Sequence, residues 1–155
     1  MATLTTTITE EITLNGKDRG SSNTMNITSV SDIYHRLVSC PANNDTTVAT
    51  FQAAVHTSDN ANPLACKYIR VTNLDQTNQV VMSLQISNDE DGTADASTSI
   101  LLTAGQSFMM SSGEEGIATS SDNANVITDT NMHDLESIII DPQGNTVQVE
   151  VFIAS

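Results

Sequence analysis

Aromatic residues are scarce in this chain, which has no Trp, two Tyr and three Phe among its 155 residues. Long apolar runs are missing as well, and no stretch approaches the ~18 consecutive apolar residues that a membrane-spanning helix requires. A chain of this length can bury a sizeable core, but that core must be built from Val, Ile, Leu and Met. The scarcity of aromatic rings also argues against a glycan-binding site, because such sites hold sugars against exposed aromatic faces.

Positive charge is also in short supply. Five Lys and Arg face nineteen Asp and Glu, which gives a net charge of -14. Such a chain repels phosphate backbones and anionic membrane surfaces, so we expect no nucleic-acid partner and no membrane partner. The polar residues are instead mainly Thr, Ser, Asn and Gln, which suit strands and turns better than helices.

Cysteine is limited to Cys40 and Cys66, which is too few for a disulfide framework in a chain of this size. We expect both to be small buried hydrophobic residues. The segment from Met1 to Glu11 has neither a basic region nor an apolar run, so we expect no secretory signal peptide.

Alternation of polar and apolar residues with a period of two is the dominant pattern, and it indicates strands. The segment from Leu4 to Leu14 is predicted as one long half-buried strand, or as two strands with a bend near Glu10. The segment from Asn15 to Ser22 is predicted as a loop. Ile33 to Cys40 is predicted as a strand, although its pattern would also suit one helical turn. Further strands are predicted around Met25 and Ile27 and at Val48–Val55, Cys66–Leu74, Val80–Ile86, Ile100–Leu102, Ser107–Met110, Ser137–Ile140 and Thr146–Ile153.

Two turn signals predict hairpins between successive strands. The first is the segment from Asn73 to Asn78. The second is Asp141-Pro142-Gln143-Gly144, which has Asp, Pro and Gly at the first, second and fourth positions of a type I turn. We expect Gly144 to adopt the left-handed conformation there and to close the strands with a bulge.

The expected fold is all-β: an antiparallel, jelly-roll-like β-sandwich of about eight to ten strands. No linker or internal repeat divides the chain, so residues 1–155 are predicted to form a single domain. Residues 1–14 are expected to form either an N-terminal arm or an edge strand.

Motifs that would carry catalysis are absent. The three histidines, His35, His56 and His133, are widely separated, and neither cysteine lies in a recognisable motif with a histidine. No nucleophile elbow, phosphate loop or dinucleotide fingerprint occurs. We therefore expect no catalytic residue, no cofactor and no enzymatic activity.

The acidic segment from Asn88 to Thr98 has part of the pattern of a calcium loop. If Gly92 took the sixth position of such a loop, Asp89 and Asp91 would take the third and fifth. The first and twelfth positions would then hold Ser87 and Thr98, where acidic ligands are needed. A solvated loop is the expectation, and a looser calcium site would use Asp89, Asp91 and Asp95.

The first strand is the best candidate for contact with another protein. It is long, rich in Thr and terminal, and such a strand either covers a sheet edge of its own domain or pairs with a neighbouring chain. The residues expected to make this contact are Leu4, Thr5, Thr7, Ile8 and Thr9.

Two stretches carry a family resemblance. The opening TLTTTITEEITLNGKDRGSSNTMNITSVSDIYHRLVSC resembles the start of small virion structural proteins of tailed bacteriophages, notably marine ones. The stretch KYIRVTNLDQTNQVVMSLQIS, followed by ILLTAGQSFMM, is similar to a pattern in phage capsid-decoration and tail-associated β-sandwiches.

This resemblance implies a virion component assembled in the host bacterial cytoplasm. The expected function is a capsid decoration, or cement, protein whose partners are the major capsid protein and copies of itself. We expect it outside the shell, because a chain of net charge -14 would meet phosphate repulsion inside a DNA-filled one. A tail, neck or fibre component is the alternative, and a glycan- or calcium-binding module is a further one.

Overall fold

The computed structural model describes residues 1–51, 60–61, 66–86, 96–111, 117–119 and 133–155. Within these ranges the chain forms strands joined by turns, without a helix, which confirms the expected all-β class. None of the described segments is therefore a helix that could cross a membrane.

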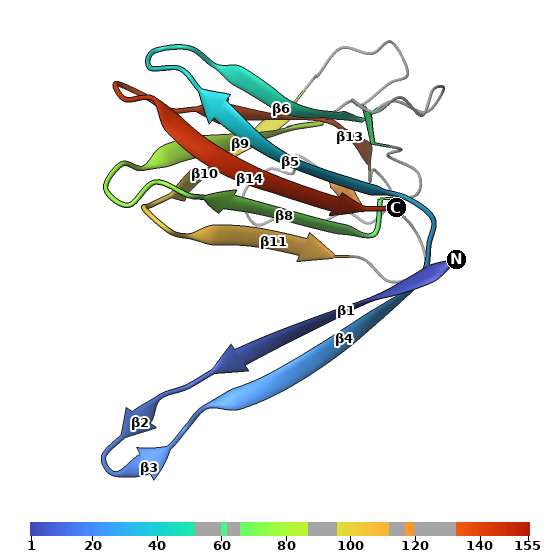
Figure 1. Ribbon diagram of the computed structural model, residues 1–155, viewed down its shortest axis with the longest axis vertical. Coiled ribbons are helices and arrows are strands. Elements are labelled where there is room, and N and C mark those ends of the chain that lie inside the picture. The colour runs from blue at the N-terminus through green and yellow to red at the C-terminus, as the bar shows by residue number, and fades with distance from the viewer. Residues whose placement is uncertain (52–59, 62–65, 87–95, 112–116, 120–132) are drawn as a thin grey trace.

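Two sheets pack face to face to form a sandwich (Figure 1). One sheet has the order β11-β8-β14-β5 and contains β5 (Ile33–Cys40), β8 (Tyr68–Asn73), β11 (Ser107–Ser111) and β14 (Val147–Ala154). The other has the order β10-β9-β13-β6-β7 and contains β6 (Thr46–Phe51), β7 (Asn60–Ala61), β9 (Val80–Ile86), β10 (Ala96–Leu102) and β13 (His133–Asp141), with β12 (Ala118–Thr119) paired to β13. The pairings are antiparallel except for the short parallel contact of β6 with β7.

The order of the long strands is that of a jelly roll. Strands β5, β8, β11 and β14 form one sheet, whereas β6, β9, β10 and β13 form the other, and the first of these strands lies beside the last. The predicted jelly-roll-like sandwich is therefore confirmed.

The core lies between the two sheets and follows the predicted alternation. Every second residue of β9 and β14 is buried, from Val80 to Ile86 and from Val147 to Ile153. Cys40 and Cys66 are buried and unbridged, as expected. Most of the remaining core side chains are aliphatic: Val48, Ile69, Val71, Leu102, Leu135, Ile138 and Ile140.

Both predicted hairpins are wrong. The turn after Asn73 joins β8 to β9, and the turn at Asp141 joins β13 to β14, but in each case the two strands belong to different sheets. The residue with positive φ in the second turn is Gln143, at 57°, and not Gly144. Both turns therefore cross from one sheet to the other. The strands that each turn joins face each other across the core and are not hydrogen-bonded neighbours in one sheet.

The segment from Leu4 to Leu14 is two strands, β1 (Ala2–Glu10) and β2 (Thr13–Leu14), which confirms the alternative with a bend near Glu10, but it is mostly exposed where half-burial was predicted. Two strand boundaries differ from the prediction. The predicted loop from Asn15 to Ser22 contains β3 (Lys17–Asp18) and the start of β4 (Ser21–Val30). The end of the predicted acidic loop is strand, since β10 begins at Ala96. The rest of that loop and residues 52–55 of the predicted strand Val48–Val55 lie outside the described residues.

A hairpin projects from this sandwich (Figure 1). Strands β1 and β4 pair antiparallel along their length, and β2 and β3 form a small second hairpin at the far end. We call residues 2–30 the arm, and residues 11–20 its tip. The predicted arm, residues 1–14, is thus one strand and part of the tip of a longer two-stranded arm.

Candidate functional site

One face of the arm is a ladder of polar side chains. Three cross-strand hydrogen bonds join β1 to β4 on this face: Thr5 to Asn26 at 2.9 Å, Thr7 to Thr24 at 3.1 Å and Thr9 to Ser22 at 3.3 Å. Paired Thr and Ser side chains of this kind stabilise antiparallel strands. The ladder therefore holds the two strands together where no core supports them.

The opposite face of the arm is largely apolar. Because side chains alternate along a strand, Leu4, Thr6 and Ile8 share this face of β1. Their partners on β4 are Ile27, Met25 and Asn23, in that order. The arm is thus amphipathic, with an apolar stripe that begins at its base and ends at Ile8, because the next pair on this face is Glu10 and Ser21.

At its base, the apolar stripe packs on the outer face of the four-stranded sheet. Ile27 and Val30 are buried there against Tyr68 and Ala154, and partly buried Leu4, Met25 and Phe152 complete the cluster. We call these seven residues the base cluster. The sheet face that would otherwise meet solvent is covered at this end by the arm.

Polar contacts fix the same junction. The carbonyl oxygen of Ser155 accepts hydrogen bonds from the backbone N–H groups of Ser31 and Asp32, at 2.6 and 3.0 Å. The Lys67 ammonium donates to the carbonyl oxygens of Thr28 and Ser29, both at 3.2 Å. The arm therefore leaves the sandwich as a fixed projection, and the direction it takes is set before any partner arrives.

Beyond the base cluster, the apolar side chains of the arm are exposed. Ile8 on β1 is 44% exposed, and Ile12 and Leu14 at the tip are 55% and 56% exposed. Among the described strands, β1 pairs with β4 alone, so each strand also keeps one open row of backbone groups. Open strand edges beside apolar side chains are a template for contact with another chain.

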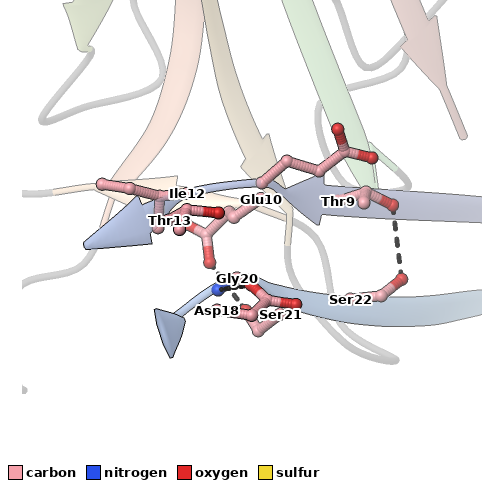
Figure 2. A pocket seen from close by; sticks show the side chains of 9 residues that line it. Thr9, Glu10, Ile12, Thr13, Asp18, Gly20, Ser21 and Ser22 are labelled. Carbon is pink, nitrogen blue, oxygen red and sulfur yellow. Dashed lines mark hydrogen bonds between the residues drawn. The ribbon is translucent and has the colours of Figure 1, made fainter. Parts of the chain in front are cut away.

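A shallow hollow lies where the tip bends away from the paired strands (Figure 2). It encloses about 640 Å³ and is lined by Thr9, Glu10, Glu11, Ile12, Thr13, Asp18, Gly20, Ser21 and Ser22. The backbone N–H of Gly20 donates to the Asp18 carboxylate at 2.8 Å, and Ser21 donates to the Glu10 carboxylate at 2.7 Å. Each of these carboxylates accepts a hydrogen bond within the chain, and both bonds support the bend.

Gly20 is required at this bend by close approach of the backbone. A Cβ atom at position 20 would overlap the carbonyl oxygen of Glu10. A side chain there would push β1 and β4 apart where the tip begins. The local fold of the tip thus depends on one glycine.

Past the base cluster, the outer face of the four-stranded sheet carries an ionic group. The Glu150 carboxylate on β14 accepts from Arg70 at 2.7 Å and from His35 at 2.8 Å. The hydrogen bond from Arg70, followed by that from His35, lowers the pKa of Glu150. The guanidinium of Arg70 also lies over the Phe152 ring, 5.9 Å from its centre.

The five residues predicted for interaction all lie on β1, but the structure divides them between the two faces. Leu4 and Ile8 are on the apolar face, and Leu4 belongs to the base cluster. The Thr5, Thr7 and Thr9 side chains form hydrogen bonds to β4 of the same chain. Pairing of β1 with another chain would therefore use the backbone groups along its open edge.

The pairing of β1 with β4 was not predictable from the local sequence. The spacing of Met25 and Ile27 predicted a strand with one apolar face, but nothing local indicated that it pairs with β1. The alternation continues in phase from Leu4 to Leu14, so it does not decide between one strand and two strands with a bend near Glu10.

A metal centre gains no support from the described residues. Asp89, Asp91 and Asp95, the candidates for a calcium site, lie outside the described residues. Within the ranges the structure describes, no three His, Cys, Asp or Glu side chains gather in a way that could hold a metal ion.

Comparison with known proteins returned little. No family model matches the chain. No curated protein matches it. A solved structure from the work "Bacillus endospore appendages form a novel family of disulfide-linked pili" is similar at 12% identity and a TM-score of 0.39, with 81% of this chain and 87% of that chain covered.

Proposed function

We propose that this chain is a non-catalytic structural protein that binds to neighbouring subunits of an assembly through its arm. The observation that carries the proposal is the exposed outer half of the arm, with Ile8, Ile12 and Leu14 open to solvent. An isolated two-stranded hairpin is marginally stable in water. A partner that covers this half would stabilise it and would itself be held by the contact.

The fixed base of the arm supports the same proposal. Residues 28–32 are held by Lys67 and Ser155, so the base of the arm loses little freedom when the outer half binds. Pre-ordering of this kind strengthens binding by reducing its entropic cost. A mobile terminal tail would not need these contacts.

The assembly we propose is the shell of a tailed bacteriophage, where the chain acts as a decoration protein on the outer surface. The sequence resemblance to virion proteins supports this setting, and jelly rolls are common in viral capsid proteins. The net charge of -14 suits an outer surface away from packaged DNA. A fold alone does not assign a function, so the arm remains the main support.

The test uses a variant whose arm is shortened without disturbing the base cluster. Thr7 and Thr24 face each other in the hairpin, so residues 8–23 can be replaced by Asn-Gly, which favours a two-residue hairpin turn. We call this the short-arm variant. It keeps Leu4, Met25 and Ile27.

The measurement is co-sedimentation with shells that lack the protein. Wild-type protein should bind, and the short-arm variant should remain in the supernatant with an unchanged melting temperature. Equal binding by the two proteins would refute the role of the arm. Binding of wild-type protein to tails or fibres but not to shells would refute the decoration role and favour the tail alternative.

A further inference from the structure

Edge strand β5 shows two exposed apolar side chains on the outer face of the four-stranded sheet. Leu37 is 61% exposed and Ile33 is 51% exposed. Among the described strands, β5 pairs with β14 alone, so its outer row of backbone groups is open. Apolar side chains along an open edge favour contact with another chain.

The arm of the same chain does not cover β5. The sheet order places β11 at one edge and β5 at the other. The hydroxyl of Ser111, at the end of β11, donates to the Met25 sulfur at 3.3 Å, so the arm leaves the sandwich near the β11 edge. Figure 1 shows the arm extending away from the sandwich on that side, with β5 beyond β14. An arm that covers Leu37 must therefore come from another molecule.

We infer that the outer half of the arm of one copy packs on β5 of a second copy. This inference rests on the proposed function and names the partner. The contact continues one that the structure already contains, because Leu4, Met25 and Ile27 pack on Tyr68 and Ala154 of the same sheet face. The base of the apolar stripe then covers the four-stranded sheet of its own molecule, and Ile8 covers the same sheet of the second copy.

Charge sets the direction in which the arm lies. Lys17 and Arg19, at the exposed tip, are two of only five basic residues in the chain. The backbone N–H of Asn43 donates to the Gln143 carbonyl oxygen at 2.6 Å, which brings the turn after β5 next to the turn before β14. Asp45 and Asp141 lie at these two turns. An arm that points along β5 toward this end places the Lys17 and Arg19 side chains near these carboxylates.

The two surfaces in this contact are different parts of the molecule. An arm on one copy and β5 on the next form a heterologous interface, which closes only as a ring or as a reciprocal exchange and otherwise extends. Each molecule offers one arm and one β5. Self-association should therefore use both surfaces in every subunit.

Sedimentation velocity of the purified full-length chain over a range of concentrations tests the inference. We expect wild-type protein to associate and the short-arm variant to remain monomeric. Leu37→Asp should weaken association by about tenfold or more, because it places a charge in an apolar contact. Leu101→Asp is the matched control: Leu101 is also exposed, at 52%, but it lies on β10 of the other sheet. The Leu101→Asp variant should associate like the wild type.

Charge reversal tests the direction of the arm. The double variant Lys17→Glu, Arg19→Glu should weaken association, and adding Asp45→Lys should recover a large part of the loss. These comparisons belong at low and moderate salt, because exposed pairs are screened within a Debye length of about 8 Å at physiological ionic strength. No recovery at low salt would overturn the assigned direction.

The outcomes that contradict the inference are separate from those that contradict the proposed function. A wild-type protein that stays monomeric at all concentrations, yet binds shells through its arm, would overturn the second copy as partner and leave the proposed function standing. Equal association of the wild type and Leu37→Asp, with a monomeric short-arm variant, would overturn β5 as the docking surface.

Discussion

Asn73 is a buried polar residue that joins two turns at one end of the sandwich. Its side-chain amide donates to the carbonyl oxygens of Asn78, Leu102 and Thr103 at 2.8, 3.2 and 3.2 Å. Its side-chain oxygen accepts from the backbone N–H of Asp75 at 3.0 Å. Asn73 thus satisfies backbone groups of the β8–β9 and β10–β11 connections, which would otherwise be costly to bury.

Replacement of this amide should therefore destabilise the whole domain. Asn73→Ala leaves buried carbonyl oxygens without a donor and should lower the free energy of unfolding by about 1–3 kcal/mol. Asn73→Asp should cost more, because it places a carboxylate against those carbonyl oxygens. Gln76→Ala, in the same turn but exposed, is the control and should change little. Urea denaturation measures all three, and an Asp variant as stable as the control would contradict this role.

Because of Glu150, the free energy of unfolding depends on pH in the acidic range. Its pKa is lowered in the folded state by the hydrogen bonds from Arg70 and His35, so the folded protein holds its charged form more strongly than the unfolded chain does. The resulting stability is fully present above the unfolded pKa of about 4.3 and is lost as pH falls through the lower folded value. Asp75 adds to this pH dependence of stability, because its pKa is also lowered in the folded state. The largest cause is the hydrogen bond from the backbone N–H of Asn78.

Glu150→Gln should therefore reduce the loss of stability between about pH 5 and pH 3. The melting temperature of the variant should fall less steeply over this range than that of the wild type, and Asp75 should account for part of the slope that remains. Parallel curves for the two proteins would show that the ionic group on the outer face does not contribute.

At the scale of elements, the turns show where local sequence stops being informative. The alternation at Val80–Ile86 and Thr146–Ile153 identified the strands and their buried faces, because burial of every second side chain is a local pattern. The turns at Asn73 and Asp141 also exist, but they arch between sheets. A type I turn can connect two neighbouring strands of one sheet or two strands of opposite sheets. The choice depends on pairings between distant strands, such as β14 with β5 and β8, which turn residues do not encode.

The arm was predictable only in part for the same reason. The alternation places Leu4 and Ile8 on one face of a strand, and it places Met25 and Ile27 on one face of a second strand. Pairing of the two depends on the bend at residues 11–12 and on the tip hairpin, in which Thr13 faces Asp18 and Leu14 faces Lys17. Exposure of the arm could not be inferred from the alternation, because an amphipathic strand has the same pattern whether a core or a partner covers it.

The tip should respond to substitution independently of the sandwich. Gly20→Ala introduces a Cβ that overlaps the Glu10 carbonyl oxygen, so it should disrupt β2 and β3. Hydrogen exchange at the tip amides should become faster, while the melting temperature of the sandwich should change little, because no core residue is touched. Gly144→Ala is the control, since open space surrounds a Cβ there. An unchanged tip in the Gly20 variant would contradict the proposed close approach.

At the scale of the whole molecule, the sandwich and the arm have different sources of stability. The sandwich has a continuous aliphatic core between two sheets, whereas the arm relies on its base cluster and polar ladder. Elements with few buried contacts open locally at low free energy. The outer arm is therefore the part of the molecule whose stability should change most when a partner binds.

Hydrogen exchange of the arm backbone, measured in the free protein and in the assembled particle, tests whether the arm is the contact between subunits. The free protein should exchange rapidly along Thr6–Glu10 and Ser21–Thr24 and slowly in β9 and β14. Assembly should slow exchange in those arm segments by about tenfold or more, because contact with a neighbouring chain stabilises the hairpin. Equal exchange rates in the arm before and after assembly would show that the arm is not the contact between subunits.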